Sequence, residues 1–142
     1  MAHITKNFPE PTVETKKFWN HCKKQELLIQ QCMACSHYQF YPRIICTTCM
    51  NRNVTWVRAT GLGKIKMYTI IHRPISKAYS APYAVALIQL AEGPMMMSNI
   101  INCDLDELAI GMGVKVAFEK WSEEITIPQF EPILTKDSLA EI

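Results

Sequence analysis

The sequence predicts a mostly β protein made of an N-terminal helix, a small unit held by four cysteines, and a five-stranded barrel. Three observations lead to this prediction. Two Cys-x-x-Cys pairs are separated by ten residues, an amphipathic segment precedes them, and five β-type segments follow Gly61. The predicted organisation is an arm, helix and cysteine unit in residues 1–60, the barrel in 61–134 and a tail in 135–142.

Length and composition indicate an ordinary soluble protein. The chain has 142 residues, of which 49% are hydrophobic and 20% charged. No apolar run approaches the roughly 20 residues that cross a bilayer. The segment Met1–Glu10 also lacks the apolar core of a secretory signal. We therefore expect a cytoplasmic protein without a membrane segment.

Charge is distributed unevenly along the chain. Residues 1–73 hold 11 Lys and Arg against 3 Asp and Glu, whereas residues 74–142 hold 4 against 10. One interpretation is that a polar partner contacts one half. The other is that the two halves complement each other within one fold.

The N-terminal segment predicts an extended arm followed by a short helix. Pro9 and Pro11 disfavour helix in the arm, and Thr12 is a suitable N-cap. Phe18, Trp19 and Cys22 then recur at helical spacing, which predicts a helix of about three turns. Four lysines flank this apolar centre: Lys16, Lys17, Lys23 and Lys24.

An apolar centre with a charged rim is typical of an interface. We therefore predict that Phe18 and Trp19, together with Met96 further along the chain, contact a partner. The alternative is that the two aromatic side chains join the cysteine unit to the barrel.

The cysteine pairs predict a metal site. Cys32 and Cys35 form one Cys-x-x-Cys turn, and Cys46 and Cys49 form the other. Two such turns facing each other supply four thiolates in a tetrahedron, the preferred geometry of zinc. Four protein ligands leave no open position, so the metal is expected to be one structural zinc, with iron as the alternative.

Two further features concern the residues after these turns and the remaining cysteines. A glycine with positive φ usually follows the second cysteine of such a turn, but Ser36 and Met50 stand there. A non-glycine residue at these positions predicts backbone strain. Cys22 and Cys103 have no partner at useful spacing, and we interpret them as small buried apolar residues.

The remainder of the chain predicts an OB-type barrel. Short strands around residues 27–29 and 54–58 flank the cysteine unit. Five further strands are expected at 64–73, 83–90, 95–103, 114–120 and 125–130, with Asp104 capping a helical turn after the third. Five strands with such a turn between the third and fourth match an OB barrel.

These residues resemble the OB-fold, acyl-CoA-associated family that carries a rubredoxin-like zinc ribbon. The resemblance covers residues 18–132. It rests on Phe18-Trp19, the approach Leu27–Cys32 to the first cysteine pair, Tyr41-Pro42-Arg43, Gly61–Ile65, Pro82–Leu87, Ile110–Val116 and Phe130-Glu131-Pro132. The resemblance implies a zinc-ribbon and OB-fold subunit.

The family resemblance also implies a function. Its members accompany thiolase-like or ketoacyl-synthase-like enzymes in hetero-oligomers that make or break carbon–carbon bonds, for example in acetyl transfer to a small ketide or phloroglucinol-type acceptor. The expected role is that of a required, non-catalytic subunit handling acyl-CoA or related donors. The four histidines are His3, His21, His37 and His72, and their spacing does not pair any of them with a nucleophile. No catalytic residue is therefore predicted.

A single-stranded nucleic-acid-binding module is the alternative function. The basic first half favours it, as do aromatic side chains that could stack on bases: Trp56, Tyr68, Tyr83, Phe118 and Trp121. The sequence pI of about 8.2 disfavours it, because basic binding domains usually exceed about 9. The barrel half is also acidic where a binding groove would be positive.

Overall fold

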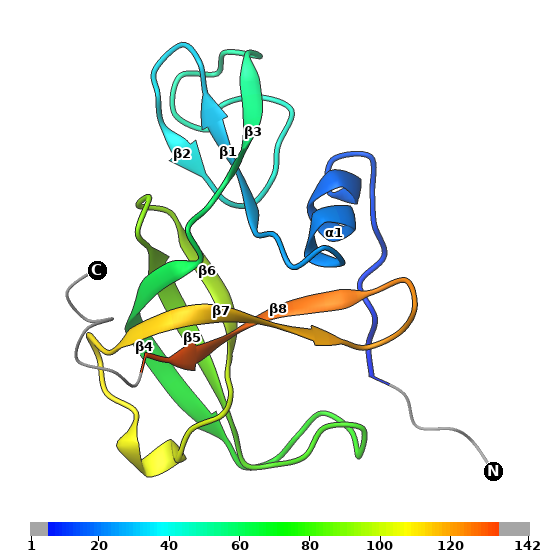
Figure 1. Ribbon diagram of the computed structural model, residues 1–142, viewed down its shortest axis with the longest axis vertical. Coiled ribbons are helices and arrows are strands. Elements are labelled where there is room, and N and C mark those ends of the chain that lie inside the picture. Colours follow the sequence, from blue (N-terminus) through cyan, green and yellow to red (C-terminus); the bar gives the residue numbers. More distant parts are fainter. Residues whose placement is uncertain (1–5, 134–142) are drawn as a thin grey trace.

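A small three-stranded sheet stands above a closed five-stranded barrel, with one short helix beside both (Figure 1). This computed structural model describes residues 6–133. The small sheet has the strand order β2-β1-β3 and is antiparallel throughout. Its elements, with the preceding helix, are α1 Lys16–Cys22, β1 Leu28–Cys32, β2 Tyr38–Gln39 and β3 Val54–Arg58. We refer to residues 28–58 as the ribbon.

The barrel confirms the predicted strand count. Its strands close in the order β4-β5-β6-β8-β7. They are β4 Leu62–Ile71, β5 Tyr83–Leu90, β6 Met95–Ile100, β7 Gly113–Lys120 and β8 Thr126–Pro132, with the 3₁₀ turn η1 Leu105–Glu107 between β6 and β7. The Asp104 side chain accepts a hydrogen bond from the Asp106 N–H, so this predicted cap is present. Only residues 59–61 separate the ribbon from the barrel.

Helix α1 is shorter than predicted. It has seven residues, about two turns, rather than about three. Thr12 precedes it in a reciprocal pair. Its Oγ1 accepts from the N–H of Thr15, and the Thr15 Oγ1 accepts from the N–H of Thr12. Thr12 therefore caps the turn that leads into the helix rather than the regular helix itself.

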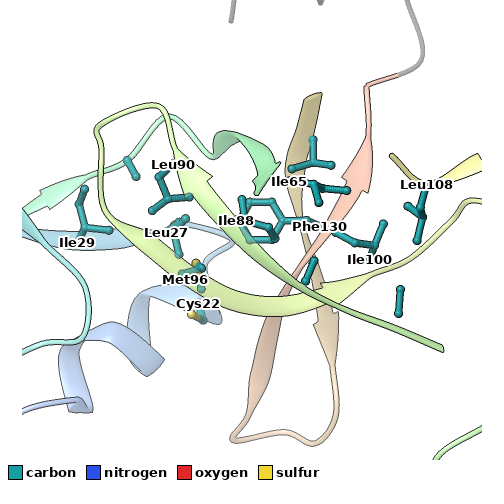
Figure 2. Packing of buried hydrophobic residues seen from close by; sticks show 14 of the residues in the cluster. Cys22, Leu27, Ile29, Ile65, Ile88, Leu90, Met96, Ile100, Leu108 and Phe130 are labelled. Atoms are coloured by element: carbon teal, nitrogen blue, oxygen red, sulfur yellow. The ribbon is translucent and has the colours of Figure 1, made fainter. Parts of the chain in front are cut away.

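One continuous apolar core joins the helix, the ribbon and the barrel. Phe130 lies at its centre and is fully buried. Figure 2 shows the labelled side chains following one another from Ile29 and Leu27 of the ribbon side, past Leu90 and Ile88, to Phe130. The ribbon therefore packs on the end of the barrel, and the two share buried surface.

Within residues 6–133, no helix is long and apolar enough to cross a membrane. The predicted tail, residues 135–142, lies outside the described part of the chain.

Candidate metal centre

The two Cys-x-x-Cys turns have the same local hydrogen bonds. The Cys32 sulfur accepts from the N–H groups of Ala34 and Cys35, at 3.3 and 3.5 Å. The Cys46 sulfur accepts from Thr48 and Cys49 at the same two distances. Each turn therefore directs backbone donors at its first sulfur, which stabilises a thiolate there.

The four sulfur atoms lie close enough together to hold one metal ion. All are within 4.8 Å of one another, and the Cys32–Cys49 and Cys35–Cys46 pairs are 3.6 Å apart. A zinc ion with Zn–S bonds of about 2.3 Å holds tetrahedral sulfurs about 3.8 Å apart. The donor set fits one structural zinc, and its four thiolates complete the coordination.

The electrostatics of the cluster follow from these contacts. The backbone N–H groups of Cys49 and Thr48 lower the pKa of the Cys46 thiol to about 6. The N–H groups of Cys35 and Ala34 likewise lower the pKa of Cys32. At Cys35 the His37 N–H favours the thiolate, but burial and the neighbouring sulfurs outweigh it and raise the pKa to about 12. In each turn, therefore, the first cysteine is the one whose lowered pKa favours the thiolate form.

The residues after the turns adopt the conformation that usually requires glycine. Ser36 has φ 65° and Met50 has φ 66°. Each N–H reaches back to the first cysteine of its turn, from Ser36 to the Cys32 carbonyl and from Met50 to the Cys46 carbonyl. The turn geometry is therefore kept at the cost of left-handed backbone strain.

Two buried glutamines support the second cysteine turn, and the sequence analysis did not identify them. Gln39 donates to the Gln30 Oε1 at 2.9 Å and to the Ile45 carbonyl at 3.2 Å. The Gln39 Oε1 accepts from the Thr47 N–H at 2.9 Å. Gln30 in turn accepts from the Arg43 N–H. The available signal was a pair of amide side chains within short strands, next to a long loop whose backbone needs partners.

The predicted partner residues differ in their accessibility. Phe18 and Met96 are each 4% exposed and belong to the core. Phe18 packs against Trp19 and Phe40, with ring centroids 5.0 and 5.5 Å away. Both side chains therefore offer little surface in the isolated chain, and the predicted partner contact stays a prediction. Trp19 remains partly accessible, and it lines a groove with Phe8 of the arm.

The other two cysteines lie in or against the core rather than at the metal centre, whereas His37 follows the first cysteine turn. Cys22 is fully buried, and burial raises the pKa of its thiol to about 12. Cys103 is half-buried and packs against the core. The His21 Nδ1 lies 2.8 Å from Glu26 Oε2, whereas His37 is exposed. His3 lies outside the described residues.

The predicted stacking residues do not form one platform. Trp56 belongs to the ribbon and packs against the core, as does Phe118 of the barrel. Tyr83 and Trp121 line a cavity of about 590 Å³. Lys6 at its edge lies 3.8 Å from Glu119 and stacks over Trp121, so its charge is already engaged. This arrangement gives little support to recognition of a phosphate backbone.

Two adjoining family models match the chain. Residues 19–55 match the rubredoxin-like zinc ribbon domain of ChsH2, and residues 56–119 match its C-terminal OB-fold domain. The chain belongs to the ChsH2 (DUF35) family. In this ChsH2-type protein the cysteine cluster is the zinc site of the ribbon, and the barrel is the OB-fold domain.

Several relatives of this ChsH2-type chain are known. A DUF35 domain-containing scaffold protein of Methanothermobacter thermautotrophicus is 34% identical over 114 residues, 78% of this chain and 86% of that protein. A probable enoyl-CoA hydratase alpha subunit of Thermomonospora curvata is 32% identical over 91% of this chain, which spans 41% of that protein. The solved structure named Ltp2-ChsH2(DUF35) aldolase has a chain that matches with a TM-score of 0.82 and 30% identity. The match covers 89% of this chain and 100% of that one.

Proposed function

We propose that this chain is a non-catalytic subunit of a hetero-oligomeric complex in which a thiolase-like enzyme subunit acts on acyl-CoA or a related acyl donor. The observation that carries the proposal is the match to the full length of the ChsH2(DUF35) chain in an aldolase assembly, at 30% identity. The relative of Methanothermobacter thermautotrophicus is named a scaffold protein, which supports the same role.

The metal centre supports a structural rather than a catalytic role for this chain. Four cysteine thiolates complete a tetrahedral zinc site, so no coordination position is left for water or substrate. The chemistry is therefore assigned to the partner, and this chain supplies surface that positions it.

The reaction is proposed to make or break a carbon–carbon bond. The aldolase name of the structural relative supports this class of reaction. Within the class, we propose acetyl transfer to a small ketide or phloroglucinol-type acceptor, on the basis of the sequence resemblance. The hydratase relatives suggest a different reaction, but the chain spans only 41% and 37% of the two hydratase alpha subunits.

The direct test is reconstitution. The thiolase-like subunit from the same organism is assayed alone, this chain alone, and both together with acetyl-CoA and a phenolic acceptor. We expect turnover only from the mixture, together with co-elution in gel filtration. Turnover by this chain alone, or an enzyme subunit that neither binds it nor responds to it, would refute the proposal.

Helix α1 is proposed to add to the partner interface through Trp19. Unlike Phe18, this side chain retains accessible surface beside the arm. Trp19→Ala should weaken co-elution, because truncation of an interface aromatic often costs about 2 kcal/mol or more. The zinc content should stay at one per chain. If the folded variant binds the partner as tightly as the parent chain does, helix α1 is not part of the interface.

A further inference from the structure

The outward surface of strands β4, β5 and β6 carries an exposed apolar row. Met67 of β4 lies opposite Leu87 of β5, which lies opposite Met97 of β6. Leu87 points out of the barrel, because its neighbours Ala86 and Ile88 are buried. Met67 is 58% exposed and Met97 is 68% exposed. The row therefore crosses three strands and is open to solvent at both ends.

Neighbouring rows extend this apolar surface. Met95 of β6 pairs with Gln89 on one side of the row and is 44% exposed. Val85 of β5 lies in the row on the other side. We name these outward residues, Met67, Val85, Leu87, Met95 and Met97, the methionine face. The three methionines, with Leu87 between Met67 and Met97, give a surface that can adapt its shape to a partner.

The edge of the methionine face is basic. Lys64 pairs with Gln89 in the row that ends at Met95. A β-bulge between Ile65 and Met67 leaves Lys66 exposed next to Met67. Within residues 6–133, neither lysine forms an ion pair; the ion pairs there involve other residues. Both charges are therefore available to a partner.

Acidic side chains are absent from the stretch of sequence that includes β4 and β5. Residues 27–91 contain no Asp or Glu but seven Lys and Arg. Most carboxylates of the barrel lie on η1, β7 and β8 or in the turns beside them, for example Asp106, Glu119 and Glu131. Glu92, in the turn after β5, accepts a hydrogen bond from the Thr60 N–H. The uneven charge along the sequence therefore places basic side chains at the methionine face and most acidic side chains near η1, β7 and β8.

We propose that the methionine face is the docking surface for the enzyme subunit, and that the partner meets it with an apolar patch bordered by Asp and Glu side chains. This rests on the proposed function. An apolar centre with a charged edge is the usual arrangement of a protein interface. Nucleic acid is disfavoured as the occupant, because methionine and leucine offer neither a ring for stacking nor a donor for phosphate.

The first test places a charge in the centre of the face. Met97→Glu and, as a second variant, Met67→Glu are compared with Met97→Leu, using titration calorimetry against the purified thiolase-like subunit. We expect the Glu variants to bind at least about tenfold more weakly and the Leu variant to bind like the parent chain. Because both positions are exposed, the zinc content and the melting temperature should be unchanged.

The second test reverses the charge of the edge. Lys64→Glu combined with Lys66→Glu should weaken binding about tenfold at low salt and less at high salt, since salt screens exposed charges. Lys120→Glu, on β7, is the control and should have little effect. An oligo(dT) titration of the same proteins measures nucleic-acid binding.

The outcomes separate this inference from the proposed function. If the parent chain does not bind the enzyme subunit, the proposed function is wrong, and the enzyme subunit is not the partner of the methionine face. If the parent binds and both Met→Glu variants bind equally well, the docking surface is elsewhere while the proposed function stands. If the paired lysine variant loses only oligo(dT) binding, the face belongs to nucleic acid and the proposal is overturned.

Discussion

The ribbon and the barrel are stabilised by different kinds of contact. The barrel closes five strands around large buried side chains such as Ile65, Ile88 and Phe130. The ribbon has three strands, one of only two residues, and converges on four sulfurs and a pair of glutamines. Side-chain burial therefore organises the barrel, whereas metal coordination and polar contacts organise the far end of the ribbon.

The difference indicates which changes each region should tolerate. A barrel core loses stability in proportion to the volume removed, because its contacts are many and individually weak. A metal site fails as a unit, because each ligand is needed for the tetrahedron. The two regions nevertheless share the core between Leu27 and Leu90. A substitution that destabilises one region should therefore also destabilise the other, to a smaller extent.

The largest effect is expected from loss of a zinc ligand. Cys32→Ser should abolish stoichiometric zinc and yield insoluble or unassembled protein, because zinc binding at such sites contributes about 10–16 kcal/mol that is coupled to folding. The measurement is elemental analysis together with soluble yield. Cys103→Ser is the matched control and should keep one zinc per chain. A soluble Cys32→Ser protein with normal zinc would show that Cys32 is not a ligand.

A cavity in the barrel should be the next most damaging change. Phe130→Ala should lower the free energy of unfolding by about 3–5 kcal/mol, because Phe130 is fully buried at the centre of the core. Denaturant unfolding measures the loss, and zinc content reports on the ribbon. Phe8→Ala, at a position 45% exposed, serves as the comparison and should cost far less. Complete loss of zinc from folded Phe130→Ala protein would contradict the expectation that damage in the barrel affects the ribbon only weakly.

The buried glutamines should give an intermediate effect confined to the ribbon. Gln39→Ala removes partners from Gln30, Ile45 and Thr47, and should cost about 1–3 kcal/mol because buried polar groups are left unpaired. Faster zinc transfer to a chelator would report the loss. Gln89→Ala, on the outer surface of the barrel, should change stability by about 0.5 kcal/mol or less. Equal effects of the two changes would argue against the support role of Gln39.

The smallest effect should come from relieving strain in the ribbon. Ser36→Gly and Met50→Gly place glycine at φ 65° and 66°, where the left-handed cost of roughly 1–2 kcal/mol disappears but glycine adds chain entropy to the unfolded state. We expect a net gain of about 0.5 kcal/mol for each, seen as slower zinc release. Ala34→Gly, in the same turn but without positive φ, should instead be neutral or destabilising.

Much of this fold could be predicted from the sequence because its strongest signals are local. A Cys-x-x-Cys turn needs only two intervening residues, so Cys32, Cys35, Cys46 and Cys49 identified the metal centre directly. The strand positions were likewise predictable from alternation between breakers such as Glu92-Gly93-Pro94. The left-handed backbone at Ser36 and Met50 also followed from turn geometry alone.

Only the tertiary structure decided which surfaces are free. Phe18 and Trp19 are neighbours on helix α1, and Met96 lies between two other methionines on β6. The packing of the helix, ribbon and barrel buries Phe18 and Met96 and leaves Trp19 partly accessible. The row from Met67 through Leu87 to Met97 joins residues as many as 30 positions apart, and strand register brings them together. Residue spacing along one strand or helix contains no information on that register, because it depends on how the barrel closes.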